Sequence, residues 1–213
     1  MIIKSFVFNR NQVNTYVVWD EETKEGMIVD CGCSSDKEFN ILKDYIGQEQ
    51  INPMCSVCTH LHFDHVWGVP FLQQEYGLAT LASRADEELL EWNMMCTMFM
   101  GLKGEERRLL QMREYSWIDN IDEIQIGHYG FTIISTPGHS PGSISLYCKD
   151  KFVLFSGDII FNQGVGRTDF EGGNRDDLYK TIDHVLRLPE ETKVFPGHNQ
   201  GFTIKERKMY EQH

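Results

Sequence analysis

The feature that most constrains this chain is a run of four metal-binding side chains within six residues: His60, His62, Asp64 and His65. In an extended segment, two imidazoles spaced by one residue project to the same side, and Asp64 and His65 follow them at a turn. Imidazole and carboxylate groups are ligands that zinc, iron and manganese prefer. One tetrahedral ion could not readily accept all four groups from so short a segment, so the run predicts two adjacent ions.

The residues around this run place it between a strand and a helix. The sequence predicts a strand that ends near Thr59 and a helix from about Val69 to Tyr76. Loops that join strands to helices are common sites for ligands. We therefore expect the run to lie in a strand-to-helix loop.

Three further segments offer one metal-binding side chain each. His139, Asp158 and His198 all follow predicted strands and have glycine as a neighbour on their N-terminal side. Glycine allows a sharp exit from a strand and lets the backbone approach an ion closely. Each segment alone would be an ordinary turn, but together at successive strand ends they favour one metal site.

The rest of the pattern predicts an α/β fold. With 213 residues and 41% apolar content, the chain can form one substantial core, so we expect a single domain over residues 1–213. Ser35 or Asp36 would begin the first helix and Gly47 would stop it. The expected strands are Phe6–Phe8, Thr15–Trp19, Gly26–Val29, Phe131–Ile134, Ser143–Tyr147, Phe152–Phe155 and Val194–Phe195, with helices over Asp36–Tyr45 and Leu178–Leu186.

Residues 84–117 have a different character. Methionine and other large apolar residues crowd together between Leu89 and Leu102, and charged residues follow from Glu105 to Arg108. We interpret this segment as a mostly helical, Met-rich insertion. It either packs on the sheet or forms a flexible lid over a substrate pocket, and the sequence does not separate these two roles.

Charge and hydropathy limit the partners. The formal net charge of −12 repels phosphate backbones, so we expect no nucleic acid partner. Residues 1–20 contain no apolar block long enough for a signal peptide or a membrane span. We expect a cytoplasmic protein with no membrane partner, and the pattern does not indicate its oligomeric state.

The order of these side chains resembles the metallo-β-lactamase superfamily, whose pattern is HxHxDH, a distant histidine, an aspartate after glycine and a final histidine. The resemblance runs from the first strands to His198 and implies a four-layer αβ/βα sandwich with two mixed β-sheets. It also implies a ligand set, in which Asp158 bridges the two ions. The first ion would be held by His60, His62 and His139, and the second by Asp64, His65 and His198.

The resemblance implies hydrolytic chemistry. Two divalent ions, for which we expect Zn²⁺ although Fe or Mn would fit the same ligands, lower the pKa of a bridging water and generate a hydroxide. Asp64 would orient this hydroxide and Asp158 would hold the ion pair together, so both count as catalytic residues. No serine or cysteine nucleophile is needed.

The segment Gly164–Phe170 resembles that of glyoxalase II-type thioesterases, the hydroxyacylglutathione hydrolases, and of the related persulfide dioxygenases. It implies a small anionic acyl thioester such as S-lactoylglutathione as substrate, with Arg167 either binding its carboxylate or pairing with Asp169 or Asp176. Larger glyoxalase II enzymes add a C-terminal helical domain, whereas only residues 199–213 follow His198, so we expect a compact relative.

Three alternatives stay open. A mononuclear iron persulfide dioxygenase would use His60, His139 and Asp158 as a facial triad. Another hydrolase of the superfamily, such as a nuclease, would need a positive phosphate-binding surface, which the charge balance does not favour. A non-catalytic metal-binding protein would be expected to lose some ligands, whereas all seven are present.

Overall fold

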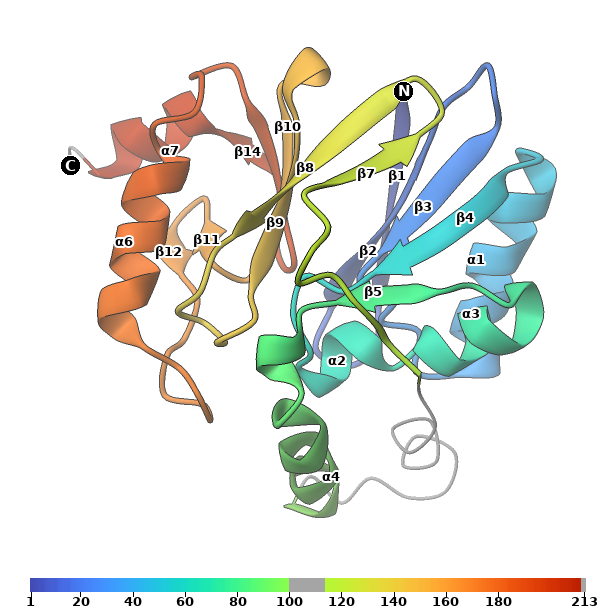
Figure 1. Ribbon diagram of the computed structural model, residues 1–213, viewed down its shortest axis with the longest axis horizontal. Helices are drawn as coiled ribbons and strands as arrows, with labels where there is room; N and C mark the ends of the chain where they lie inside the picture. Colours follow the sequence, from blue (N-terminus) through green and yellow to red (C-terminus); the bar gives the residue numbers. More distant parts are fainter. Residues whose placement is uncertain (100–113, 212–213) are drawn as a thin grey trace.

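The computed structural model describes residues 1–99 and 114–211, and its centre consists of two six-stranded sheets (Figure 1). The first sheet has the order β1-β2-β3-β4-β5-β6. Its first three strands pair antiparallel, and the others pair parallel from β3 onward. The strands are β1 (Ile2–Phe8), β2 (Val13–Trp19), β3 (Glu25–Val29), β4 (Asn52–Val57), β5 (Thr80–Ala82) and β6 (Ser116–Trp117).

The second sheet has the order β14-β13-β10-β9-β8-β7 and is also mixed. Only β10 and β13 pair parallel; the other neighbours are antiparallel. A separate two-stranded hairpin of β11 (Ile160–Phe161) and β12 (Gly164–Val165) follows β10. The strands of the second sheet are β7 (Glu123–Ile126), β8 (Tyr129–Ser135), β9 (Ile144–Cys148), β10 (Val153–Gly157), β13 (Lys193–Pro196) and β14 (Phe202–Thr203).

The alternation of side chains along β2 explains why both faces of its sheet are covered. Tyr16 and Val18 point into the core between the two sheets, where they join Phe131 and Phe155 of the second sheet. Val17 and Trp19, one residue out of phase, lie in a different apolar cluster together with helical side chains. A strand buried on both faces is apolar nearly throughout, as β2 is.

Helices cover the outer faces of both sheets (Figure 1). Leu42 of α1 and Leu72 of α3 pack on the first sheet, and Leu178 and Ile182 of α6 pack on the second. The layers run helix, sheet, sheet, helix, which confirms the predicted four-layer sandwich with two mixed sheets. The helices are α1 (Asp36–Gln48), α2 (Phe63–Val66), α3 (Val69–Tyr76), α4 (Leu89–Phe99), α6 (Arg175–Val185) and α7 (Ile204–Glu211).

The end of α1 differs from the expectation. Its N-cap is Ser35, whose hydroxyl accepts a hydrogen bond from the Glu38 N–H, but the helix continues through Gly47 to Gln48. The left-handed residue that ends it is Gln50, at φ 55°, and the Ile51 N–H returns to the Ile46 carbonyl. Packing of Ile51 in the core beneath the helix therefore sets the stop, and Gly47 does not.

The segment predicted as a mostly helical insertion is helical only in part. It begins with a short 3₁₀ turn, Arg84–Asp86, and continues into α4, but Ser116–Trp117 form the edge strand β6 beside β5. The sequence did not predict this edge strand, because its pairing with Leu81 and Ala82 is long-range and leaves no local signal. Residues 100–113 of the insertion lie outside the described residues.

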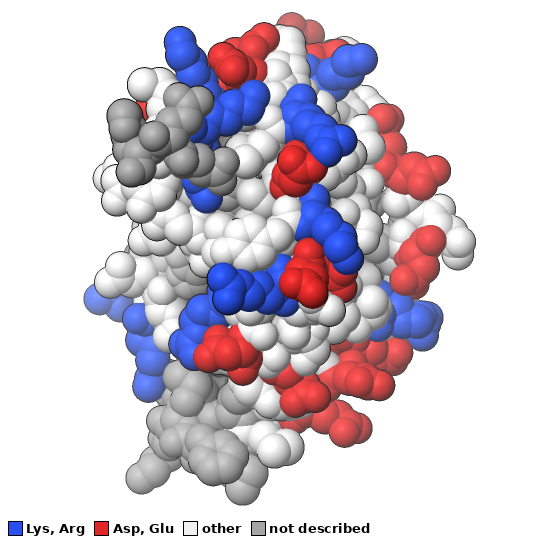
Figure 2. All heavy atoms as spheres, turned by 90° about the vertical axis from the view of Figure 1, so that its left-hand side faces the viewer, with Lys and Arg blue, Asp and Glu red and all other residues white. Residues whose placement is uncertain are grey.

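The face that carries α6 and α7 shows interleaved basic and acidic side chains (Figure 2). On α6, Lys180 pairs with Asp177, and Arg187, just after this helix, pairs with Asp183. Pairing of this kind prevents a continuous basic surface on this face. No helix within residues 1–99 and 114–211 combines the length and apolar character needed to cross a bilayer.

Candidate metal centre

All seven predicted ligands lie together, on loops that leave strands of both sheets. His60 and His62 follow β4, and Asp64 and His65 lie in the short helix α2. In the second sheet, His139 lies between β8 and β9, Asp158 directly follows β10, and His198 follows β13. Because β10 and β13 are parallel neighbours, their carboxyl ends bring Asp158 and His198 to the same sheet edge.

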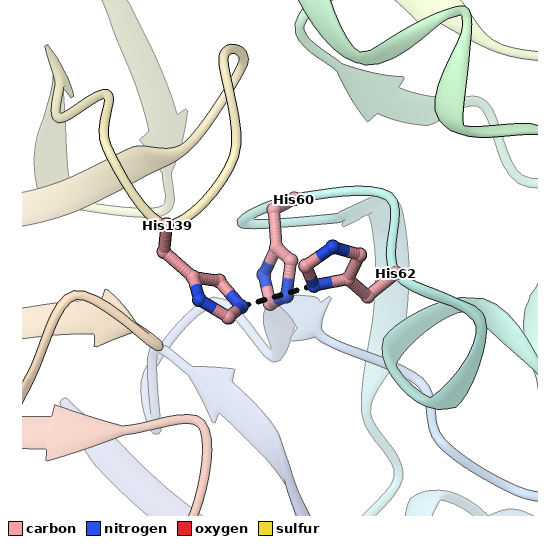
Figure 3. Close-up of side chains that lie close together, drawn as sticks. All are labelled: His60, His62 and His139. Atoms are coloured by element: carbon pink, nitrogen blue, oxygen red, sulfur yellow. Dashed lines mark hydrogen bonds between the residues drawn. The ribbon is translucent and has the colours of Figure 1, made fainter. Parts of the chain in front are cut away.

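The first group consists of His60, His62 and His139, whose imidazoles turn toward one another (Figure 3). The Nδ1 of His62 lies 2.9 Å from the Nε2 of His139. One ring nitrogen from each histidine lies within 4.8 Å of the others, which is the spacing of ligands around a single ion.

The second group consists of Asp64, His65 and His198, and Asp158 lies between the two groups. The Oδ2 of Asp158 is 3.3 Å from His198 Nε2 and 3.6 Å from His65 Nε2 in the second group. The same oxygen is 3.8 Å from His139 Nε2 in the first. One carboxylate thus faces ring nitrogens from both groups, which is the position that a bridging ligand requires.

The buried polar atoms at this centre fit metal ions. His60 Nε2, His65 Nε2 and Asp158 Oδ1 are buried and have no hydrogen-bond partner among the described residues. A buried polar group without a partner costs about 1–3 kcal/mol, so a cluster of them calls for a ligand. Nitrogen and carboxylate donors are the set that divalent transition metals take.

Burial sets the protonation of the first group. It lowers the pKa of His60 well below its usual range, and the neighbouring imidazoles add to this effect. Burial and the neighbouring His139 lower the pKa of His62 to about 3. Both rings are therefore neutral at pH 7, which is the form that binds a metal.

Neighbouring carboxylates dominate the electrostatic environment of the two histidines in the second group. Burial alone would lower the pKa of His65, but the surrounding carboxylates, led by Asp158, raise it well above its usual range. His198 behaves similarly: burial opposes the charge, yet Asp158 and Asp64 raise its pKa to about 9. Surroundings that favour a cationic imidazole also favour a divalent cation.

Two residues that the sequence did not single out support the ligands. Asp30, directly after β3, places its Oδ2 3.0 Å from His65 Nδ1 and accepts hydrogen bonds from the Thr59 N–H and hydroxyl. Asn11, in the turn between β1 and β2, donates its side-chain amide to Asp64 Oδ2 at 3.0 Å. The only local signal for Asp30 was an aspartate at the end of an apolar strand.

Close packing at the centre explains two of the glycines. A Cβ atom at Gly197 would lie 2.1 Å from Asp158 Oδ1, and one at Gly166 would lie 1.9 Å from the Asp158 carbonyl oxygen. A larger residue at position 197 would displace the Asp158 carboxylate, and one at position 166 would displace the Asp158 backbone. Glycine next to these ligands is therefore a packing requirement.

The centre opens into a pocket of about 420 Å³. Phe170 forms much of its wall, since its ring centroid lies 5.7 Å from that of Trp92 and 5.3 Å from that of His62. The pocket is lined by Asn11, His62, Phe63, Asp64, Trp92, His139, Asp158, Phe161, Val165, Gly166, Arg167, Phe170, His198 and Asn199.

Arg167 reaches this pocket while engaged in a pair of its own. Its Nε and Nη2 donate to the two carboxylate oxygens of Asp169 at 2.9 and 2.7 Å, and its guanidinium lies 4.4 Å from the Phe170 ring centroid. Of the two structural partners considered from sequence, Asp169 is the one it bonds. Its carbonyl oxygen also lies 2.7 Å from His139 Nδ1, which leaves Nε2 of that ring for an ion.

The chain is similar in sequence to known proteins. The family model described as the metallo-β-lactamase superfamily matches residues 8–198. Hydroxyacylglutathione hydrolase GloC of Haemophilus influenzae is 30% identical over 200 residues, which cover 92% of this chain and 90% of that protein. The residues matched by the family model include every ligand-bearing loop described above.

Solved structures agree. The BLEG-1 B3 metallo-β-lactamase superposes with a TM-score of 0.84 at 30% identity, over 98% of this chain and 97% of that one. TTHA1623, solved in a di-iron-bound form, gives a TM-score of 0.80 at 26% identity, over the same shares of both chains. With its sandwich of two mixed sheets and its clustered histidines and aspartates, the chain belongs to the metallo-β-lactamase superfamily.

Proposed function

We propose that this chain is a two-metal hydrolase of the glyoxalase II type, which cleaves a small acyl thioester. The observation that carries the proposal is the position of Asp158 Oδ2, within 3.3–3.8 Å of ring nitrogens from both groups of ligands. Asp158 would bridge two ions. The first would be held by His60, His62 and His139, and the second by Asp64, His65 and His198.

The residues around the pocket favour attack by water. The seven clustered side chains would hold two divalent ions, which when bound would lower the pKa of a water molecule toward neutrality and polarise the carbonyl group under attack. None of the described residues that line the pocket is a serine, threonine or cysteine, so they offer no hydroxyl or thiol nucleophile there. Asp64, held by the amide of Asn11, would orient the attacking water.

The same lining favours a leaving group that needs no proton. The histidines and aspartates of the pocket are all assigned to ions, which leaves no separate general acid among the described residues that line it. A thiol has a pKa near 8.5, so a thiolate leaves without protonation, whereas an amine or an alkoxide does not. This argument and the similarity to GloC support a thioester. The equal identity to a B3 metallo-β-lactamase means that similarity alone does not choose the substrate.

An anionic substrate would fit beside Arg167. The Nε and Nη2 of Arg167 donate to Asp169, so we expect the Nη1 of Arg167 to contact a substrate carboxylate at the pocket rim. The pocket volume of about 420 Å³ suits a small acyl thioester such as S-lactoylglutathione. Zn²⁺ is the metal we expect, with iron or manganese possible for the same ligands.

The test is a thiol-release assay on purified protein reconstituted with Zn²⁺, Fe²⁺ or Mn²⁺, with metal content measured on the same samples. We expect two ions per chain and metal-dependent hydrolysis. His60→Ala should abolish hydrolysis, and the matched control His184→Ala, at an exposed position on α6, should not. A single iron per chain with oxygen consumption would instead support a persulfide dioxygenase. Reconstituted protein that turns over no thioester would overturn the proposal.

A further inference from the structure

Leu61, the residue between the two histidines of the first group, has both of its backbone groups bound by side chains. Its N–H donates to Asp86 Oδ2 at 3.0 Å, and its carbonyl oxygen accepts from Asn93 Nδ2 at 2.6 Å. Asp86 lies in the 3₁₀ turn and Asn93 in α4, so both partners come from the segment that opens the insertion. All three residues are buried.

Asp86 also binds the loop of the third histidine. Its Oδ2 accepts from the Ser140 hydroxyl at 2.8 Å, and its Oδ1 accepts from the Gly142 N–H at 2.5 Å. Ser140 directly follows His139. A single carboxylate therefore connects the loop of His60 and His62 with the loop of His139, and these loops belong to different sheets.

These contacts need a carboxylate at position 86. Both of its oxygens act only as acceptors, since Oδ1 faces one donor and Oδ2 faces two. An amide in its place would turn an NH₂ group toward at least one donor. A buried carboxylate is costly, and a position that merely fills space would be occupied by an apolar side chain.

From these contacts we propose that Asp86 and Asn93 are positioning residues for the first ion. They fix the Leu61 backbone and thereby set the directions of His60 and His62, while Asp86 fixes His139 through Ser140. The inference rests on the proposed metal centre. It gives residues 84–93 a role other than packing on the sheet or covering the pocket. Through Asp86 and Asn93 they would hold His60, His62 and His139 in place.

The same segment fixes one wall of the pocket. Trp92 precedes Asn93 on α4, and its ring centroid lies 6.3 Å from that of His62. Asn93 donates a hydrogen bond to the loop that carries His60 and His62. This bond fixes the position of α4, and therefore of Trp92, relative to those two histidines. The hydrogen bond of Asn93 would thus position both the pocket wall at Trp92 and the ligands His60 and His62.

The test compares Asp86→Asn and Asn93→Leu with Thr80→Val. The control removes a buried side-chain hydrogen bond of similar length, between Thr80 and Ser56 at 2.8 Å, away from the ligand loops. Zn²⁺ affinity is measured by competition with a chromogenic chelator, coordination by the visible spectrum of the Co²⁺-loaded protein, and folding by thermal unfolding.

We expect Asp86→Asn and Asn93→Leu to weaken Zn²⁺ binding roughly 10–100-fold and to change the Co²⁺ spectrum, as loss of a residue that orients ligands does. Thr80→Val should lower the melting temperature but leave affinity and spectrum unchanged. Ser140→Ala removes only one of the donors to Asp86 and provides a milder variant if Asp86→Asn does not fold; it should give a smaller loss of affinity in the same direction.

Folded variants that bind Zn²⁺ as tightly as the wild type, with an unchanged Co²⁺ spectrum, would overturn the inference. So would an equal loss of affinity in Thr80→Val, because the effect would then follow stability alone. The readout is independent of the reaction. If the wild type binds two ions and hydrolyses no thioester, the proposed function fails while the positioning role is still decided by affinity.

Discussion

Asp30 Oδ2 lies 3.0 Å from Nδ1 of His65, with both side chains buried. A carboxylate behind a metal-binding imidazole fixes its tautomer and raises its basicity, so that Nε2 points at the ion. Asp30 also holds the Thr59 backbone N–H at 2.7 Å, at the start of the metal-binding run. It therefore supports the second group directly and the first through Thr59.

We expect Asp30→Asn to weaken metal binding roughly 10–100-fold, because the amide retains the shape but loses the charge that orients His65. Chelator competition measures the loss. The exposed Asp44 on α1 supplies the control Asp44→Asn, which should bind metal like the wild type. Equal affinity for both variants would show that the Asp30 carboxylate does not support the ligand.

Gly197→Ala should displace the Asp158 carboxylate from the place where it would bridge two ions. The new methyl group would lie 2.1 Å from Asp158 Oδ1 and 2.6 Å from His65 Cε1, so one of these ligands must move. A displacement of about 1 Å at a reacting centre costs roughly 100-fold in rate. We expect at least that loss in hydrolysis, together with reduced metal content. Normal metal content and rate would contradict the packing argument.

Gly47→Ala is the opposite case. Gly47 lies inside α1, and a Cβ atom there would have no neighbour within 4 Å. Alanine in a helix is favoured over glycine by about 0.5–1 kcal/mol, so the free energy of unfolding should rise by that amount. Denaturant titration measures it. A loss of stability would mean that Gly47 does help to end the helix.

Trp92→Ala should change specificity more than chemistry. The Trp92 ring and Phe170 form an apolar wall beside His62, so the variant should raise KM for thioesters with bulky apolar acyl groups. A hydrophobic contact of this kind distinguishes substrates by roughly 10-fold or more. An acetyl thioester should be affected little, and kcat should change less than KM. Equal losses for both substrates would argue against a role in recognition.

Asp20 makes the free energy of unfolding depend on pH in the acidic range. It accepts hydrogen bonds from the His128 backbone N–H and from the Glu22 N–H, and chiefly the first lowers its pKa from 3.8 to about 2. A pKa that folding depresses contributes stability above pH 3.8, and this contribution is lost as the pH falls toward 2. Asp20→Asn should therefore be less stable than the wild type at pH 7, with a smaller difference at pH 3. Denaturant midpoints at the two pH values measure this, and a difference that grows on acidification would contradict it.

How much of this was visible in the sequence depends on how local each signal is. His60, His62, Asp64 and His65 lie within six residues of the chain, and the glycines beside His139, Asp158 and His198 mark strand ends, so the residues that cluster at the centre could be predicted. Most of the longer strands and helices could be predicted because their apolar residues recur with a fixed period, whereas short strands such as β5 and β6 could not. The end of α1 could not, because it depends on Ile51 packing against the core.

The supporting residues were not visible, because their partners are far away in the chain. Asp30 meets His65, Asp86 meets Ser140 and Asn93 meets Leu61 only once the sandwich has formed. An isolated aspartate or asparagine in a sequence is most often a surface or turn residue. Only the fold distinguishes these three from the others of their type.

The most direct test of the central claim is the anomalous diffraction signal from crystals of the protein loaded with Zn²⁺. We expect two peaks, one between His60, His62 and His139 and the other between Asp64, His65 and His198, with Asp158 touching both. A single peak held by His60, His139 and Asp158, or no peak among these residues, would contradict a two-metal hydrolase.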